Sequence, residues 1–131
     1  MRHAILVLVP CITINQFYGG TLLMTSNTQL NKGVLEGCVM KLVKTEYLCP
    51  SEIVEAMRTA GFTEFSEGTL YPMLLRIEKE GCFETMRQIT RNSPPKKYYK
   101  LSENGRERLK HFYLMWTATA QNVAKIFDNE E

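Results

Sequence analysis

The side chains best suited to binding a ligand in this sequence are basic residues that gather in one stretch. Between Cys82 and Lys110, eight basic residues stand against three acidic ones. The basic residues are Arg87, Arg91, Lys96, Lys97, Lys100, Arg106, Arg108 and Lys110. Beyond Lys110 a single lysine opposes three acidic residues, so an acidic tail follows the basic stretch. Clustered guanidinium and ammonium groups indicate binding to phosphate oxygens.

Residue patterns typical of catalysis or metal binding are lacking. The sequence has no phosphate-binding loop, no nucleophile beside a base in a recognisable pattern and no paired-carboxylate motif. The cysteines form no CxxC pair and lie far in sequence from His3 and His111; they are Cys11, Cys38, Cys49 and Cys82. We therefore expect no enzyme activity, no cofactor and no metal, and free, mostly buried thiols in a reducing cytoplasm. A redox sensor is the alternative, and no pattern supports it.

Length and composition indicate one globular domain. The chain has 131 residues, of which 44% are hydrophobic and 23% are charged. These values are close to the globular average, and the length suffices for a single hydrophobic core. The net charge of +2 is too small to identify a partner, so the placement of the charges carries the information.

Residues 1–28 are predicted to be an N-terminal extension or leader. An apolar run from Ala4 to Val9 follows two basic side chains, as in an export signal. Pro10 ends this run, no small-x-small cleavage site follows, and the run is far shorter than a membrane span. We therefore expect a cytoplasmic protein without a membrane segment. Whether residues 1–23, upstream of Met24, are an appended leader stays open at this point.

Two helices are predicted next in the chain. The first runs from Gln29 to about Thr45, with apolar residues at steps of three and four, as one buried helix face requires. These apolar residues are Leu30, Val34, Leu35, Cys38, Val39 and Leu42. The second begins near Pro50, which is tolerated in a first turn, and ends at Gly61. Its apolar face comprises Ile53, Val54 and Met57.

A third helix is predicted between a Ser66 cap and Gly81. Its inward stripe comprises Leu70, Met73, Leu74 and Ile77. At 100° per residue the opposite face carries Gly68, Thr69, Pro72, Arg76 and Lys79, with Tyr71 beside it. This face is slim and positive toward its far end, which predicts the close approach of a partner. Pro72 either marks an early turn near Thr69 or only sets the entry to the helix.

A β-hairpin is predicted over residues 82–101. Two runs of extended-chain formers, CFETMRQI and KKYYKL, flank the turn residues TRNSPP. Pro94 and Pro95 cannot donate ladder hydrogen bonds and should keep the tip irregular. Arg91, Lys96 and Lys97 are expected at this tip. Three helices followed by a basic hairpin predict a winged helix-turn-helix, mainly α, with a helix in a DNA groove and the hairpin along the backbone.

Two long motifs also resemble a known family. SEGTLYPMLLRIEKEG and PPKKYYKLSENGRERL look like the PadR family of bacterial transcriptional regulators, and QLNKGVLEGCVMKLV resembles its first helix. The resemblance covers about residues 29–127 and departs from the family at CPSEI. It implies a winged helix over residues 29–101, a C-terminal dimerisation helix over residues 102–131, and repression that a small molecule relieves.

A last helix is predicted from Glu103 to Phe127 after a Ser102 cap. Its stripe repeats at steps of three and four and comprises Leu109, Phe112, Trp116, Thr119, Val123 and Ile126. A helix of this length spans about 37 Å at 1.5 Å per residue, longer than one small winged helix can cover. We therefore expect a homodimer that reads a roughly palindromic site in double-stranded DNA.

The predicted DNA-binding residues come from the third helix and the hairpin. They are Ser66, Gly68, Thr69, Tyr71, Arg76, Lys79, Arg91, Lys96, Lys97 and Tyr98. Thr69, Tyr71 and Arg76 are expected to contact the major groove. The basic residues of the β-hairpin, Arg91, Lys96 and Lys97, are expected to contact phosphates or the minor groove. The alternative is a winged helix that binds another protein and no DNA. Steep loss of duplex binding with salt would distinguish the two.

The single tryptophan, Trp116, has two interpretations. An aromatic residue in a helical stripe usually packs in a core, and we favour this reading. The family resemblance implies another, because some multidrug-sensing members hold planar aromatic ligands between paired tryptophans on this helix. Tyr113, Met115 and Met40 are then expected to add adaptable walls to an effector site.

Overall fold

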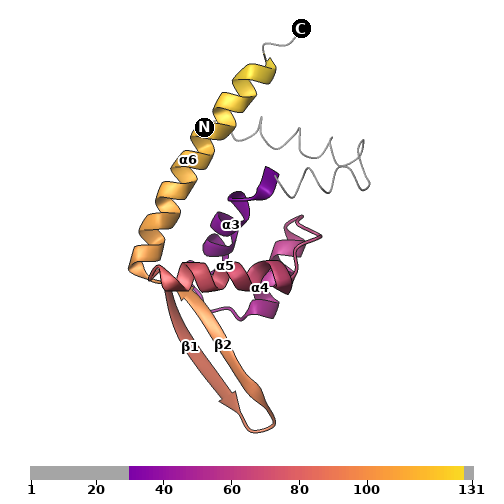
Figure 1. The fold of residues 1–131 in the computed structure, drawn as a ribbon, viewed down its shortest axis with the longest axis vertical. Coiled ribbons are helices and arrows are strands. Elements are labelled where there is room, and N and C mark those ends of the chain that lie inside the picture. The colour runs from indigo at the N-terminus through magenta and orange to yellow at the C-terminus, as the bar shows by residue number, and fades with distance from the viewer. Residues whose placement is uncertain (1–29, 129–131) are drawn as a thin grey trace. The chain divides into compact units, whose positions relative to one another are not determined.

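The computed structural model describes residues 30–128 (Figure 1). Within them four α-helices accompany one two-stranded antiparallel sheet, in the predicted order of three helices, hairpin and last helix. The elements are α3 (Val34–Leu42), α4 (Pro50–Thr59), α5 (Glu67–Lys79), β1 (Phe83–Thr90), β2 (Ser93–Leu101) and α6 (Glu103–Asp128). The predicted fold class is therefore confirmed. The predicted leader, Cys11 and Gln29 lie outside the described residues.

The first helix is shorter than the sequence predicted. Gly33 has a φ of +95°, a left-handed conformation that a continuous right-handed helix does not contain, so α3 begins at Val34. Leu30, which was assigned to the buried face, is 75% exposed. At the other end α3 stops at Leu42 instead of Thr45. Met40, which the predicted stripe omitted, is buried on this helix.

The next two helices end at the predicted glycines. After α4, Gly61 has a φ of +123° and donates its N–H to the Arg58 carbonyl, while the next residue reaches back to Met57. After α5, Gly81 has a φ of +78° and its N–H bonds to Glu78. Both ends are Schellman motifs, in which glycine supplies the left-handed residue and the last carbonyls are satisfied.

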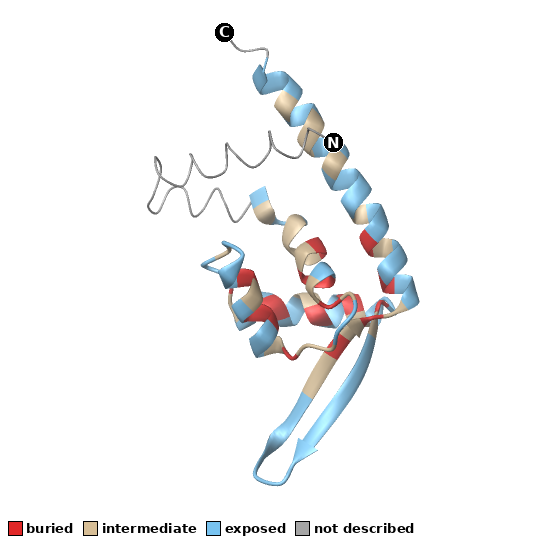
Figure 2. Ribbon diagram, turned by 180° about the vertical axis from the view of Figure 1, so that it is seen from behind, coloured by how far each residue is buried: buried red, intermediate tan, exposed pale blue. Residues whose placement is uncertain are grey.

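The hydrophobic core lies where α3, α4 and α5 meet the root of the hairpin, whereas the outer part of the hairpin is exposed (Figure 2). All these core residues lie between positions 35 and 111, which form one compact unit. They are Val39, Met40, Val43, Cys49, Ile53, Val54, Met57, Phe65, Leu70, Leu74, Ile77, Cys82, Tyr99, Leu101 and Leu109. The predicted inward stripes of the second and third helices are therefore largely buried.

The root of the hairpin is tied to the loop that follows α3. Leu48 and Tyr99 exchange backbone hydrogen bonds of 3.0 and 2.9 Å, and the Leu101 N–H donates to the Val43 carbonyl at 2.8 Å. These hydrogen bonds pair backbone groups on the edge of β2 that faces away from β1. An isolated hairpin would leave these groups unpaired. The hairpin is therefore anchored at its base and exposed at its tip.

Ser102 is the only residue between β2 and α6. Its side chain accepts the Gly105 N–H at 3.1 Å and donates to the Gly81 carbonyl at 2.8 Å, so it is the predicted N-cap. Its own N–H donates to the Cys82 carbonyl at 2.9 Å. The start of α6 is thereby fixed to the end of α5 and the start of β1.

Residues 112–128 complete α6 and belong to a separate unit from residues 35–111. All of these residues are exposed or half-buried in the single chain. Within residues 30–128, no helix combines the length and the apolar character that crossing a bilayer requires.

Candidate nucleic-acid interface

The first turn of α5 is capped by Ser66 and exposed to solvent. Ser66 adopts an extended backbone, and its Oγ accepts the Thr69 N–H at 3.4 Å while its carbonyl accepts the Leu70 N–H at 3.0 Å. Gly68 and Thr69 are exposed in the first turn. A helix N-terminus of this kind presents backbone N–H groups and a positive partial charge, which favour an anionic partner.

Pro72 lies inside α5 rather than at its start. The helix begins at Glu67, before the start near Thr69 that would have placed Pro72 in the first turn. Pro72 has no N–H to donate to the Gly68 carbonyl, four residues earlier. Both residues are exposed, so solvent can reach this carbonyl and the lost hydrogen bond costs less than it would in the core.

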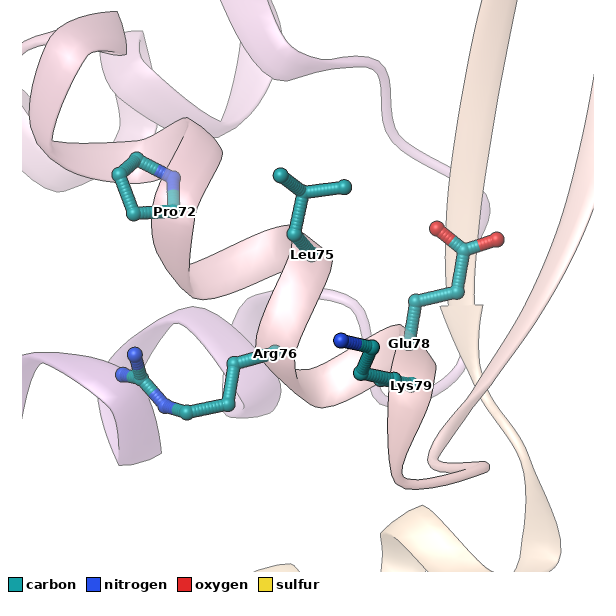
Figure 3. Close-up of a pocket in the computed structure, with 5 residues that line it drawn as sticks. All are labelled: Pro72, Leu75, Arg76, Glu78 and Lys79. Atoms are coloured by element: carbon teal, nitrogen blue, oxygen red, sulfur yellow. The ribbon is translucent and has the colours of Figure 1, made fainter.

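The outward face of α5 is more apolar than its predicted residues indicate. A surface pocket follows this face, and Figure 3 shows its lining residues, which are Pro72, Leu75, Arg76, Glu78 and Lys79. Leu75 is 70% exposed and Tyr71 is 46% exposed. Leu75 is not among the predicted residues of this face, which were chosen for their small size or positive charge. The helical period alone placed Leu75 on it.

Arg76 is paired within the protein rather than pointing freely outward. Its Nε donates to Glu36 on α3 at 2.9 Å, and its Nη2 also contacts that carboxylate. Arg108, in the second turn of α6, donates to the other oxygen of Glu36 at 3.0 Å and also contacts Glu80. One carboxylate therefore joins α3, α5 and the start of α6. To contact a DNA base, Arg76 would have to break its ion pair with Glu36.

The outer part of the hairpin carries two exposed basic residues. Arg91 lies in the turn between β1 and β2, and Lys96 pairs in register with Gln88. The register shifts between Gln88 and Thr90, opposite the two prolines of β2. This irregularity was predicted, because proline cannot donate to a strand ladder.

Lys97 is not at the tip, and that part of the prediction was wrong. It pairs in register with Arg87, well along β2 from the Thr90–Ser93 pair that closes the turn. Its Nζ lies 3.0 Å from both oxygens of Glu78 on α5 and 5.3 Å from the centroid of the Tyr99 ring. This lysine therefore connects the hairpin to α5 within the protein.

The two tyrosines beside Lys97 differ in burial. Tyr98 is half-buried, so it retains the accessible surface that its predicted role requires. Tyr99 is buried and packs edge-on against Phe83 with a centroid distance of 5.2 Å. Burial raises the pKa of Tyr99, and nearby Lys97 opposes the shift.

Two residues assigned to the effector site and the dimer stripe belong to the core of the winged helix. Met40 is 2% exposed, so it is not an accessible effector wall. Leu109 is 8% exposed and packs within the single chain, so it is not free to form a dimer seam. Helical spacing identifies an apolar face but not what covers it, which is why Leu109 was misassigned. Met40 was expected in the effector site only as an adaptable side chain that the family resemblance implied.

The remaining residues of the predicted stripe are accessible. Trp116 is 37%, Val123 48% and Ile126 71% exposed; Thr119 is also exposed and Phe112 is half-buried. Tyr113 and Met115, predicted for the effector site, are 63% and 55% exposed. This half of α6 thus presents a run of apolar side chains that the described chain leaves uncovered.

The three described cysteines are free thiols, as predicted. Cys49 and Cys82 are buried and Cys38 is half-buried. Burial raises the pKa of the Cys38 thiol, and burial together with the Glu36 carboxylate raises the pKa of Cys82. A raised pKa keeps these groups protonated and poorly nucleophilic. Among residues 30–128 no cluster of three or more potential metal ligands occurs.

The fold is a winged helix-turn-helix. It consists of three helices, the third of which is capped and exposed, followed by an anchored hairpin. The family model described as "Transcriptional regulator PadR-like family" matches residues 39–111. The chain therefore belongs to the PadR-like family of transcriptional regulators, and the resemblance seen in the sequence is confirmed.

Solved structures agree with this assignment. The PadR-like transcriptional regulator from Bacillus cereus is 34% identical, with a TM-score of 0.69 over 78% of this chain and 99% of that one. A Streptococcus transcriptional regulator is 36% identical, with a TM-score of 0.66 over 75% of this chain and 96% of that one. Bacillus subtilis PadR, solved in complex with operator DNA, shares the fold at 22% identity and a TM-score of 0.56, over 61% of this chain and 46% of that one. No curated protein matches the chain at a significant level.

Proposed function

We propose that this regulator is a homodimeric repressor that binds a pseudo-palindromic operator and releases it when a small aromatic molecule binds. The main support for DNA binding is the outward face of α5. On this face Gly68 and Thr69 leave little side-chain bulk, and Lys79 adds positive charge. A helix of this shape can lie deep in a major groove. The operator complex of Bacillus subtilis PadR supports the same use of the fold here.

The residues divide into those that touch DNA and those that hold the DNA-binding surface. Gly68, Thr69 and Tyr71 enter the major groove, and Ser66 fixes the first turn that presents them. Arg91 and Lys96 contact phosphates from the hairpin, and Lys79 and Tyr98 add further contacts to the DNA. Arg76 and Lys97 act differently from the first expectation, as positioning residues that hold α5 to α3 and to the hairpin through Glu36 and Glu78.

The first test is the salt dependence of binding. Replacing both Arg91 and Lys96 by alanine should weaken binding to every duplex and lower the slope of log K against log salt by about two, since each lost phosphate contact removes about 0.9 from it. The measurement is fluorescence anisotropy with a labelled duplex at several salt concentrations. Lys110→Ala, which removes an exposed base of α6, is the matched control and should leave the slope unchanged.

The outcomes separate the two functions of a winged helix. An unchanged slope in the double variant would overturn the role of the hairpin in phosphate binding. Absence of salt-sensitive duplex binding in the unaltered protein would overturn the repressor proposal itself and favour the alternative, a module that binds another protein.

The effector site is tested through the single tryptophan. In a twofold dimer built on α6, Trp116 and its copy face each other near the axis, with Tyr113 and Met115 beside them. Planar aromatic compounds should quench Trp116 fluorescence and release the operator over the same concentration range, because a ligand acts only by favouring one state of the dimer. Quenching without release, or release without quenching, would place the effector elsewhere or remove its regulatory role.

A further inference from the structure

Leu75 stands out on α5 because it is a large aliphatic side chain on the outward face. It is 70% exposed, whereas Leu70 and Leu74 on the same helix are 0% and 1% exposed. A single exposed leucine is common in proteins and needs no explanation by itself. Here, however, Leu75 lies one turn after exposed Pro72, and the two line the same surface pocket (Figure 3).

The surroundings of this apolar pair indicate a polyanionic partner rather than an apolar protein surface. Lys79 follows Leu75 by one turn on the same face. The other charged residues that line the pocket, Arg76 and Glu78, are paired with Glu36 and Lys97. The hairpin adds exposed Arg91 and Lys96. An apolar pair beside a lysine, on a domain whose hairpin carries further exposed basic residues, fits a groove wall that phosphates flank.

The major-groove edge of DNA offers one apolar group, the C5-methyl of thymine. The other edge groups are hydrogen-bond donors and acceptors, and a leucine would remove them from water without providing a partner. A leucine in the groove therefore favours thymine over the other three bases at the position it faces.

We propose that Leu75, supported by Pro72, reads the C5-methyl group of a thymine in each operator half-site. This inference rests on the proposed entry of α5 into the major groove and adds the base class that this side chain selects. The side chain of Pro72 is a closed ring without freely rotating bonds. It therefore forms a rigid surface, and the thymine methyl group is enclosed between this surface and Leu75.

The test removes the methyl group without changing base pairing. The full-length protein first selects its site from a random duplex library, and each thymine of that site is then replaced by deoxyuridine. Affinity should fall about fourfold per methyl contact, the equivalent of the ~0.8 kcal/mol for one buried CH₂ group, at one position in each half-site. Leu75→Ala should bind the thymine and deoxyuridine forms equally well.

Ile89→Ala is the matched control. Ile89 is also a large exposed aliphatic residue, at 77%, but it lies on β1 of the hairpin, so its removal should leave the preference for thymine over deoxyuridine intact. Thermal melting of both variants should match that of the unaltered protein, because neither side chain is buried.

The failure of this inference can be told from failure of the proposed function. Specific binding that is insensitive to every deoxyuridine, or an equal preference in Leu75→Ala and the unaltered protein, would overturn the thymine contact and leave DNA binding in place. Failure to select any duplex would overturn both and assign the apolar pair to a protein partner.

Discussion

Gly105→Ala is expected to lower the melting temperature of the winged helix by roughly 10 °C. Gly105 is buried in the first turn of α6, and a Cβ there would overlap the Cys82 carbonyl oxygen and lie 2.9 Å from Leu101 Cδ2. Backbone cannot move aside as a flexible side chain can, so the first turn of α6 must shift away from Cys82. Overpacking of this kind costs about 1–3 kcal/mol, and each kcal/mol shifts the melting temperature of a domain this size by about 4–8 °C.

The same substitution at Gly68 is the control for stability. A Cβ on Gly68 would meet only Ser66 Oγ, at the ordinary distance of 3.6 Å. Alanine is also favoured over glycine in a helix by about 1 kcal/mol, so Gly68→Ala should melt at the same temperature or higher. Its operator affinity should nevertheless fall, because the added methyl group thickens the slim face of α5. An unchanged melting temperature in Gly105→Ala would contradict the close packing of α6 on Cys82.

Introducing charge on the exposed stripe of α6 is expected to abolish dimerisation. Val123 and Ile126 are 48% and 71% exposed in the single chain and lie on one face of α6. In the proposed dimer both are buried, so a Val123→Glu/Ile126→Glu variant must bury unpaired carboxylates. The protein should sediment as a monomer. Operator affinity should fall roughly 100-fold or more, because the two half-sites are no longer bound by linked modules.

Gln121→Glu is the matched control for the charged variant. It adds one carboxylate on the opposite side of α6 with almost no change in shape, and it should leave both the dimer and operator binding intact. A charged double variant that remains dimeric would show that this stripe is not the seam. Monomers that bind the full operator as tightly as the unaltered protein would contradict reading of two half-sites by a twofold dimer.

The elements that sequence predicted well are those set by neighbouring residues. The Ser66 and Ser102 caps, the glycines that end α4 and α5, and the prolines of the hairpin act over a few positions, so their effects are visible in the chain itself. The inward stripe of α5 follows from the helical period in the same way.

The misassigned residues depend on contacts between distant parts of the chain. Glu36, which pairs Arg76, lies 40 positions away from it, and Arg108 is 72 positions from Glu36. Sequence spacing cannot reveal such pairs, so the sequence predicted that Arg76 contacts the major groove. Leu109 shows the same limit for an apolar residue, since its period predicts burial but not whether a core or a second chain provides it.

The one-residue connection at Ser102 makes the first turn of α6 part of the winged helix. The Ser102 side chain accepts the Gly105 N–H, and the Ser102 N–H donates to the Cys82 carbonyl, so the cap of α6 and the root of the hairpin share one residue. Local unfolding that opens the root of the hairpin would therefore also uncap α6, and the two cannot open independently.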